Sequence, residues 1–282
     1  MTPDVLLVGC GDLGAAIGQR LATQGHEVLA IRRRAELVPA PLRGLSADLT
    51  RESPVLPSLD LAHLVVCLTA RPRTEVAYRE TYVEGMGRAL DALAAADQSP
   101  RRAVLISSTA VFGDTPTDVL IDESTPTQPA DGPGKMLLEA EKLFAERMPH
   151  GTVLRLSGLY RLGGGRLVER VRTGQINDPH RWTNRIHRDD AAAAVVHLLT
   201  RAESPDRLYL GTDDEPAQLG DVAAYLATRL DAPAPPEADP ALGHGKRLSN
   251  ARLRASGWVP QYPTYRQGYA APLLPPDLPS TR

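Results

Sequence analysis

Residues 5–14 read VLLVGCGDLG and decide the fold of the first half of the chain. The apolar run 5–8 predicts a buried β-strand, and Gly9, Gly11 and Gly14 follow it with the spacing G-x-G-x-x-G. Leucine or isoleucine then recurs at positions 13, 17 and 21, which predicts a helix with one apolar face. A strand, a glycine turn and a helix in this order are typical of a dinucleotide-binding site.

The glycine loop is expected to hold a pyrophosphate. Gly9 would make the tight turn, Gly11 would let the ligand approach the backbone, and Gly14 would let the helix pack on the strand. Asp12 and Leu13 fall in the first turn of the helix, where free N–H groups and a partial positive charge suit phosphates. An ordinary structural turn is the alternative interpretation, because glycines also mark such turns.

The stretch HEVLAIRRR at 26–34 predicts which dinucleotide binds. The second strand would end here beside the adenosine ribose, where an NAD site places Asp or Glu for the 2′-hydroxyl. This chain has Arg32, followed by Arg33 and Arg34. A guanidinium suits a 2′-phosphate that a carboxylate would repel, so we expect NADP, with NADPH preferred over NADH. Three solvated arginines on a surface turn are the alternative.

Composition limits the classes of function. The 282 residues are 42% hydrophobic with a formal net charge of −2, and no Lys/Arg cluster is large enough to follow a nucleic-acid backbone. No segment approaches 18 uncharged apolar residues, and the first strand begins too early for a signal peptide. We therefore expect a cytoplasmic protein with a small-molecule substrate and without a nucleic-acid or membrane partner.

The two cysteines and seven histidines predict no metal site. Cys10 and Cys67 are too few for zinc, and the histidines are scattered without ligand spacing. We expect both cysteines to be small packed residues in a reducing compartment.

Strand-like and helical runs alternate through the first half of the chain. Strands are expected at 4–8, 27–31, 43–47, 63–68 and 102–107. A second amphipathic helix is predicted by the apolar spacing of Val83, Met86, Leu90 and Leu93. This βαβ alternation predicts an α/β fold with a Rossmann-type, doubly wound parallel sheet.

The second half is less regular and shows no internal repeat. A loop at 109–134, rich in Thr, Pro, Asp and Gly, precedes the next elements, and proline-rich stretches lie at 231–240 and after Ala270. We expect residues 1–155 to form an NADP-binding core and 156–282 to form mostly a smaller substrate lobe, with some segments returning to the core. A helix at 135–147, a strand at 151–156 and helices at 189–202 and 218–230 are predicted.

Five segments together resemble a known family. They are the glycine loop, SADLT at 46–50, VLISSTAVFG at 104–113, LRLSGLY at 154–160 and NRIHRDDAAAA at 184–194. In this combination the chain resembles the extended short-chain dehydrogenase/reductases, which include sugar-nucleotide epimerases and dehydratases. The resemblance is closest to an atypical branch of NAD(P)-dependent epimerases that shares NRIH-x-DD and an ending like SNARLRASGWVPQYPTYRQGY at 249–269.

The resemblance implies further contacts with the cofactor. Asp48 and Leu49 would lie at the adenine, where the family has an Asp-Leu pair after its third strand. Leu68 and Thr69 would end the fourth strand beside the ribose, and Ser107 would join the same cofactor-binding set.

For catalysis the resemblance points first to Ser108, at the position of the family's catalytic Ser/Thr. Its hydroxyl would bind a substrate oxygen, and a strand-end serine that satisfies the backbone is the alternative. The family then carries Tyr-x-x-x-Lys, in which the lysine orients the nicotinamide ribose, whereas DGPGK at 131–135 offers Lys135 for the lysine and Asp131 in place of the tyrosine. A solvated residue in the first turn of a helix is the alternative for Lys135. The chain therefore departs from the family pattern at the residue that moves the proton.

Two tyrosines are candidates to replace the missing phenol. Tyr82 stands where the resembling enzymes have an Asn facing the active site, and Tyr78 lies one turn earlier on the same face. Packing between helix and sheet is the alternative for Tyr82. Tyr160, after the sixth strand, is a second candidate for contact with the substrate.

The segment NRIHRDD is expected to reach the substrate. In the resembling enzymes this region brings an Arg or Asn toward a nucleotide phosphate, which suits Asn184 and Arg185. His187 is a candidate for ligand contact or for a structural hydrogen bond, and Asp190 is expected to tie the second lobe to the core.

Two functions follow from these residues. The first is an NADP(H)-dependent oxidoreductase or epimerase that acts on a carbonyl or sugar-nucleotide-like small molecule, with Ser108 assisted by Tyr82, Asp131 or Lys135. The alternative is a non-catalytic NADP(H) sensor, comparable to nitrogen-metabolite regulators that keep this fold and lose the tyrosine. Retention of Ser108 favours the enzyme, and a homodimer is a candidate assembly.

Overall fold

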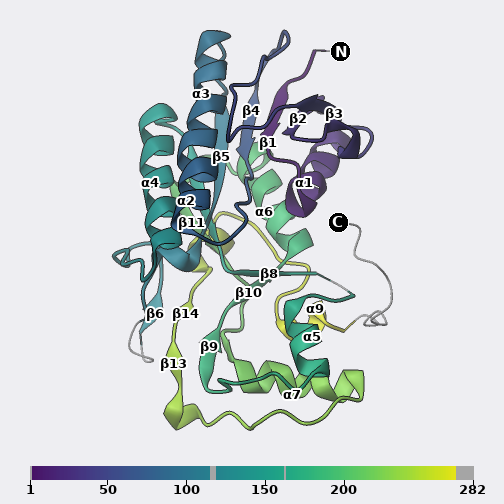
Figure 1. The fold of residues 1–282 in the computed structure, drawn as a ribbon, viewed down its shortest axis with the longest axis vertical. Coiled ribbons are helices and arrows are strands. Elements are labelled where there is room, and N and C mark those ends of the chain that lie inside the picture. The colour runs from purple at the N-terminus through teal and green to yellow at the C-terminus, as the bar shows by residue number, and fades with distance from the viewer. Residues whose placement is uncertain (1, 115–118, 162, 271–282) are drawn as a thin grey trace.

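The computed structural model describes residues 2–114, 119–161 and 163–270. Its centre is a seven-stranded sheet in the order β11-β7-β5-β4-β1-β2-β3, in which every neighbouring pair is parallel (Figure 1). The expected Rossmann-type, doubly wound α/β fold is confirmed, because the strand order runs outward from β1 in one direction and from β4 in the other. The strands are β1 (Val5–Val8), β2 (Val28–Arg32), β3 (Arg43–Ser46), β4 (His63–Val66), β5 (Arg102–Ser108), β7 (Thr152–Leu156) and β11 (Leu208–Gly211).

Helices cover both faces of this sheet (Figure 1). They are α1 (Asp12–Thr23), α2 (Glu75–Tyr78), a π-helical segment (Arg79–Gly85), α3 (Met86–Ala95), α4 (Gly132–Arg147) and α6 (Arg188–Thr200). α1 packs on α6 over one face, and α2 to α4 cover the other. Alternate side chains of β1 enter two separate cores, with Leu7 on the α1 side and Leu6 on the α3 side. Burial on both faces explains why β1 reads as an unbroken apolar run.

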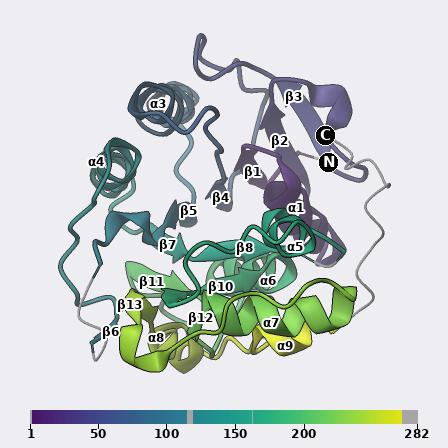
Figure 2. The ribbon, with the colours of Figure 1, turned by 60° about the horizontal axis from the view of Figure 1, so that its bottom comes forward.

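The second half of the chain builds a lobe next to the core (Figures 1 and 2). The elements of this half outside the core sheet are β8 (Gly158–Tyr160), α5 (Arg166–Arg172), β9 (Arg181–Thr183), β10 (Arg185–His187), β12 (Ala217–Gln218), α7 (Leu219–Leu230), β13 (His244–Gly245), α8 (Ala251–Ala255) and α9 (Tyr265–Gly268). β8 pairs with β10, and β9 pairs with β12 and β13. Val222, Leu226 and Tyr265 are fully buried in a separate apolar cluster of this lobe. The chain passes back to the core in α6 and β11.

The loop expected at 109–134 contains short regular elements among its described residues, 109–114 and 119–134. A 3₁₀ turn, Thr109–Val111, follows β5 directly, and β6 (Leu120–Ile121) pairs with β14 (Arg247–Leu248) from the far end of the chain. α4 begins at Gly132 and not at residue 135, because the Asp131 side chain caps it. Two further 3₁₀ turns lie at Ala35–Leu37 and Pro240–Leu242.

The fourth strand is shorter than expected. It ends at Val66, after which Cys67 N donates to Val8 O (2.8 Å) and the chain leaves the sheet. Leu68 and Thr69 therefore lie beyond the strand and do not end it. Cys10 and Cys67 are buried, free cysteines, as expected.

Within the described ranges, no helix is long and apolar enough to span a bilayer. The same residues contain no cluster of His, Cys, Asp and Glu arranged to hold a metal ion.

Candidate functional site

The glycine loop is closely packed at both ends and open in the middle. Gly9 has a φ of +98°, and a Cβ there would lie 2.3 Å from Cys67 O. A Cβ at Gly14 would lie 2.3 Å from Gly9 O, whereas a Cβ at Gly11 would meet nothing within 4 Å. The only position of the three that leaves space beside the backbone is thus the one where a pyrophosphate must approach.

The first turn of α1 adds hydrogen-bond donors to this space. Gly11 is the N-cap and supplies no side-chain acceptor, and the first helical hydrogen bond runs from Ala15 N to Gly11 O (2.8 Å). The N–H groups of Asp12, Leu13 and Gly14 therefore lack helical acceptors, which makes this end of α1 a site for an anion. The side chain of Leu13 is buried beneath the loop.

Arg32, the last residue of β2, lies at the edge expected for the adenosine ribose. Its Nη1 donates to Leu37 O (2.8 Å), which turns the guanidinium toward the 3₁₀ turn at 35–37. Arg33 is exposed, and its carbonyl accepts from Ser46 Oγ (2.9 Å). Two guanidiniums therefore lie at the end of β2, from its last residue and the next one, and no carboxylate occupies this place.

The pair expected at the adenine lies just after β3. Asp48 accepts hydrogen bonds from Thr50 N (3.1 Å) and Thr50 Oγ1 (2.7 Å), and these bonds are the main cause of its lowered pKa. Leu49 is buried, and its carbonyl accepts from Arg88 Nη1 (2.7 Å). Asp48 is thus an ionised turn residue at this edge.

Ser107, expected among the cofactor contacts, has its side chain in a buried hydrogen-bond network. Its Oγ donates to Glu141 Oε1 (2.5 Å), and Glu141 is paired with Arg155 Nη2 (2.7 Å). All three side chains are buried between the sheet and α4. Successive residues of a strand face opposite sides, so the Ser107 side chain is directed to this network and away from Ser108's side.

Ser108 ends β5, and its Oγ accepts a hydrogen bond from Ala110 N (3.2 Å). The serine thus satisfies the backbone of the following turn, which is the structural role that the sequence left open. It is only half-buried, and a hydroxyl that accepts one bond keeps its own hydrogen for donation. Both roles are therefore compatible in one side chain.

Asp131 is held as a helix cap. Its Oδ1 accepts from Gly134 N (2.7 Å) and its Oδ2 from Arg73 Nη2 (3.0 Å). Partial burial opposes ionisation, but these two bonds prevail and the pKa of Asp131 lies below its ordinary value. The carboxylate is ionised at neutral pH, so it does not suit the role of proton donor. Lys135 is exposed in the same first turn.

Tyr82 lies in the π-helical segment, with its ring 5.1 Å from that of Tyr78. Its hydroxyl donates to Leu68 O (3.2 Å), and burial raises the pKa of the phenol well above its ordinary value. Thr69, the next residue after Leu68, is exposed.

Lys246 is a residue of this region that the sequence reasoning missed. Its Nζ donates to Phe112 O (2.8 Å) and Thr109 O (3.3 Å), across the turn that follows Ser108. Burial is the main effect that lowers the pKa of the ammonium. The only signal in the sequence was rarity, since the chain has three lysines. The charged groups around it are Arg73, Asp114, Asp131 and Arg181.

A cleft of about 610 Å³ opens between the first turn of α1 and the lobe. Tyr160 and Arg185 lie in its wall, and the Tyr160 hydroxyl and Arg185 Nη1 are buried without a hydrogen-bond partner among the described residues. Asp213, beside Arg185, has an unpartnered Oδ2, and burial raises the pKa of this carboxyl to about 8. The charged residues in the wall of the cleft are Asp12, Arg161, Arg166, Arg170, Arg185 and Arg188.

Asn184 and His187 have structural partners. Asn184 lines the cleft, but its Nδ2 donates to Lys246 O (2.8 Å) and its Oδ1 accepts from Leu248 N (2.9 Å). His187 is fully buried and its Nδ1 accepts from Asp189 N (3.2 Å), whereas its Nε2 has no hydrogen-bond partner among the described residues. The structural hydrogen bond is thus present, and ligand contact by His187 stays a prediction. Asp190 accepts from Gln261 N (2.7 Å) and so ties α6 to the C-terminal segment.

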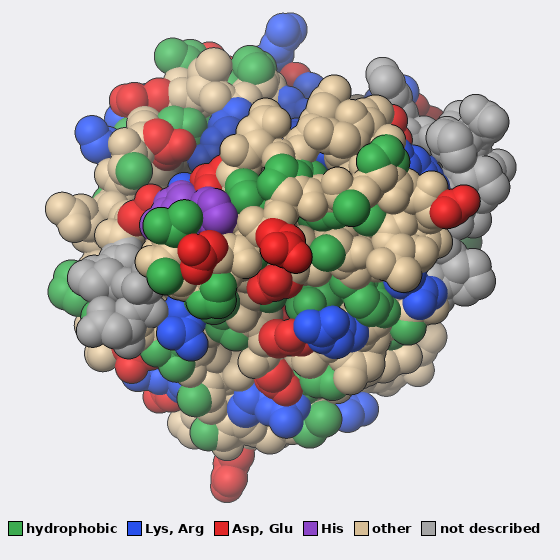
Figure 3. Space-filling view, turned by 90° about the horizontal axis from the view of Figure 1, so that it is seen from below, with side chains coloured by type: hydrophobic (Ala, Val, Ile, Leu, Met, Phe, Trp, Pro, Cys, Tyr) green, Lys and Arg blue, Asp and Glu red, His purple; other side chains and the backbone are tan. Residues whose placement is uncertain are grey.

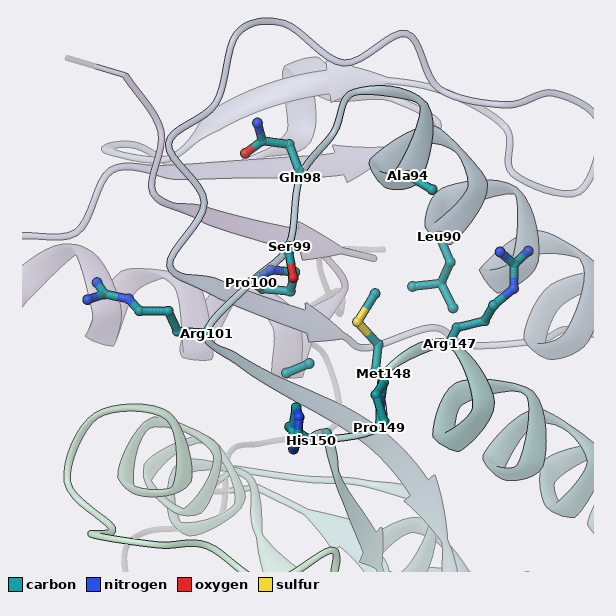
Figure 4. A pocket seen from close by; sticks show the side chains of 12 residues that line it. Leu90, Ala94, Gln98, Ser99, Pro100, Arg101, Arg147, Met148, Pro149 and His150 are labelled. Atoms are coloured by element: carbon teal, nitrogen blue, oxygen red, sulfur yellow. The ribbon is translucent and has the colours of Figure 1, made fainter.

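A second, smaller cavity of about 200 Å³ lies far from these residues, where β5 and β7 begin. Figure 4 shows Leu90, Met148 and Arg147 around it, on α3 and at the end of α4. Ligands of doubly wound sheets bind at the opposite, carboxyl ends of the strands, so this cavity is not the candidate site. Figure 3 shows the lobe end of the molecule, where acidic, basic and apolar side chains are interspersed.

Comparison with known proteins decides the family. The model of the NAD dependent epimerase/dehydratase family matches residues 5–150, which include the glycine loop, Ser108 and Lys135. The chain belongs to this family. The resemblance to extended short-chain dehydrogenase/reductases is thereby confirmed.

Three known proteins match this chain over different shares of their length. A Methylobacillus flagellatus protein named for the same family is 37% identical, with a TM-score of 0.80 over 96% of this chain and 98% of the other. The dTDP-6-deoxy-L-talose 4-dehydrogenase (NAD(P)(+)) of Kitasatospora kifunensis is 31% identical over 166 residues, which are 56% of this chain but only 51% of that enzyme. The human epimerase family protein SDR39U1, solved with NADPH, shares the fold at 22% identity and a TM-score of 0.73, covering 94% and 97% of the two chains.

Proposed function

We propose that this protein is an NADP(H)-dependent oxidoreductase or epimerase that acts on a carbonyl or sugar-nucleotide-like small molecule. The observation that carries the proposal is the glycine loop, which leaves space only at Gly11, directly over the uncapped first turn of α1. When bound, a nicotinamide cofactor supplies or accepts the hydride. The Kitasatospora enzyme is named for NAD(P)(+), and the human protein was solved with NADPH. Both support this class of cofactor.

The preference for NADP is proposed from Arg32 and Arg33. Arg32 ends β2 and Arg33 follows it, at the place where NAD-selective sites have a carboxylate for the ribose 2′-hydroxyl. A guanidinium can leave a main-chain carbonyl such as Leu37 O for a phosphate, because the charged hydrogen bond is stronger. Asp48, Leu49, Leu68 and Thr69 remain the proposed contacts on the adenosine side.

The substrate is proposed to occupy the cleft beside Tyr160 and Arg185. Buried polar atoms without partners are rare and mark places where a ligand or water completes the hydrogen bonds. The Tyr160 hydroxyl and Arg185 Nη1 are such atoms, and together they suit an oxygen-rich, anionic group such as a nucleotide phosphate. Asn184 contributes to the wall of the same cleft.

For the chemical step we propose that Ser108 binds the reacting oxygen of the substrate. Lys246 positions Ser108 by holding the carbonyls of the following turn, and Lys135 is retained as the candidate for the nicotinamide ribose. Tyr82 and Asp131 suit structural roles better, because one donates to the main chain and the other is an ionised cap.

The structural roles of Tyr82 and Asp131 support the second candidate, a non-catalytic NADP(H) sensor. If neither Tyr82 nor Asp131 donates a proton, a bound cofactor can be held without turnover. A small-molecule partner, a cytoplasmic location and a homodimer belong to both versions of the proposal.

One experiment tests the function and separates the two candidates. The purified chain is first titrated with NADPH and NADH, and then incubated with NADPH and a panel of dTDP- and UDP-sugars, aldehydes and ketones while the absorbance of reduced nicotinamide is followed. We expect NADPH to bind and at least one substrate to oxidise it. Binding without oxidation by any member of the panel would support the sensor, and no binding of either cofactor would refute both candidates.

A further inference from the structure

Two arginines, one from the lobe and one from the start of α6, meet one carboxylate at the glycine loop. Arg188 Nη1 lies 3.0 Å, and Arg161 Nη1 3.7 Å, from the same oxygen, Oδ1 of Asp12. Arg161 directly follows β8 and Arg188 is the first residue of α6, so they come from different parts of the second half of the chain. Asp12 itself is the first residue of α1 and contributes one of the free N–H groups described above.

Stability does not account for this arrangement. The side chains of Asp12 and Arg161 are 53% and 47% exposed, and ion pairs at such positions contribute little to folding. Asp12 and Asp189, which lies 2.9 Å from Arg188, together balance the charges of the two guanidiniums. The pairs therefore hold two arginines beside the first turn of α1.

The wall of the cleft carries a surplus of positive charge. Five arginines and one aspartate are the charged residues of its wall. One of these, Arg185, is 5% exposed, and its Nη1 has no hydrogen-bond partner among the described residues. A concave wall with this charge attracts an anion, and the anion that the proposed function brings to the mouth of the cleft is the cofactor's pyrophosphate.

We propose that Arg161 and Arg188 form an arginine clamp that binds the pyrophosphate of the nicotinamide cofactor from the lobe side, opposite the N-terminus of α1. Asp12 holds the two guanidiniums beside the loop before the cofactor arrives. The helix end supplies only a partial charge of about half a unit, whereas each guanidinium brings a full charge and a fork of donors that matches phosphate oxygens. The clamp rests on the proposed function for the identity of its ligand.

The test compares affinities for two cofactors in single variants. Arg161→Ala and Arg188→Ala should each raise the Kd about tenfold, as expected for the loss of a hydrogen bond to a charged group, measured by fluorescence titration. The loss should be equal for NADPH and NADH, because both contain the pyrophosphate. Arg254→Ala is the control, since Arg254 is an exposed arginine of α8 that does not line the cleft, and it should stay within about twofold of the wild type.

A double-variant cycle separates the clamp from simple neutralisation of Asp12. If the arginines only cancel the charge of Asp12, the effect of Arg188→Ala should vanish in an Asp12→Asn background. The clamp requires that the loss persist there. Melting temperatures of all variants confirm that they are folded.

Three outcomes are decisive. A loss that persists in the Asp12→Asn background supports the clamp. Unchanged cofactor affinity in both arginine variants overturns it and assigns the two residues to the substrate or to the surface. Failure of the wild type to bind NADPH or NADH would instead refute the proposed function itself.

Discussion

The hydroxyl of Tyr82 donates a hydrogen bond to the main-chain carbonyl of Leu68, over 3.2 Å. This bond joins the π-helical segment to the chain just after β4, on the side where the cofactor is expected. Burial raises the pKa of this phenol, so the hydroxyl stays protonated over the whole neutral range. A tyrosine in this state supports the fold of the site and is a weak proton donor.

The first prediction concerns the proton donor. Tyr82→Phe should lower the free energy of unfolding by about 1 kcal/mol through loss of one hydrogen bond, and it should leave NADPH affinity within about twofold. Asp131→Asn should cost a similar amount, because the cap of α4 weakens. A loss of turnover of about 10²-fold or more in either variant, with normal cofactor binding, would make that residue the donor after all.

The second prediction concerns Lys246. Lys246→Met should lower the free energy of unfolding by about 1–3 kcal/mol, because the half-buried carbonyls of Thr109 and Phe112 lose a charged donor. Lys142→Met, an exposed lysine on α4, should change it by less than about 0.5 kcal/mol. Urea unfolding measures both values. Equal stabilities of the two variants would show that the bonds from Lys246 do not hold the turn after Ser108.

The third prediction concerns the choice of cofactor. A ligand at 100 times its Kd adds about 2.7 kcal/mol of stability, so NADPH should raise the melting temperature by roughly 5–10 °C, and NADH at the same concentration by less. Arg32→Asp should reverse this order, whereas Arg34→Asp, two residues later in an exposed position, should keep it. Equal shifts with both cofactors in the wild type would contradict the role of Arg32.

The fourth prediction uses the unequal surroundings of the glycines. Gly11→Val should fold with a melting temperature within a few degrees of the wild type, since its Cβ enters open space, but it should no longer bind NADPH. Gly14→Ala should be strongly destabilised instead, because its Cβ would lie 2.3 Å from Gly9 O. Unchanged NADPH affinity in Gly11→Val would mean that the loop is only a turn.

The fifth prediction concerns pH. Burial is the main cause that raises the pKa of Asp213 to about 8 from 3.8, so the folded protein keeps a proton that the unfolded chain releases. The free energy of unfolding should therefore fall as the pH rises from about 4 to about 8. The Asp213→Asn variant cannot ionise at this position, so its melting temperature relative to the wild type should rise across this pH window. Asp221→Asn, at an exposed position, is the control and should show no such rise. A constant difference between pH 5 and pH 8 would show that Asp213 is ionised throughout.

Much of the core could be predicted because its signals are local. The run of apolar residues at 5–8, the glycine spacing and the apolar period of α1 all depend on the geometry of neighbouring residues along one chain. The same holds for the alternation of strands and helices, which permits few topologies. Element ends were less certain, as at α4, since a cap is decided by one side chain.

The roles at the site depended on contacts between distant residues. Lys246 reaches the turn at Thr109 from 137 residues away, and Arg188 reaches Asp12 from 176. No local pattern marks such a pair, because it arises only when two elements pack together. Ser107 shows the same limit: a strand places adjacent serines on opposite sides, but only α4, carrying Glu141, decides that Ser107 belongs to a buried network.

The sequence by itself determined the Rossmann core, the glycine loop and the arginines at the end of β2, because each follows from residues close together in the chain. Tertiary structure alone decided that Asp131 is an ionised cap paired with Arg73, that Tyr82 donates to the main chain, and that Arg161 and Arg188 meet at Asp12. The reason is physical: protonation and hydrogen bonding depend on burial and on partners in space, which the order of residues does not specify.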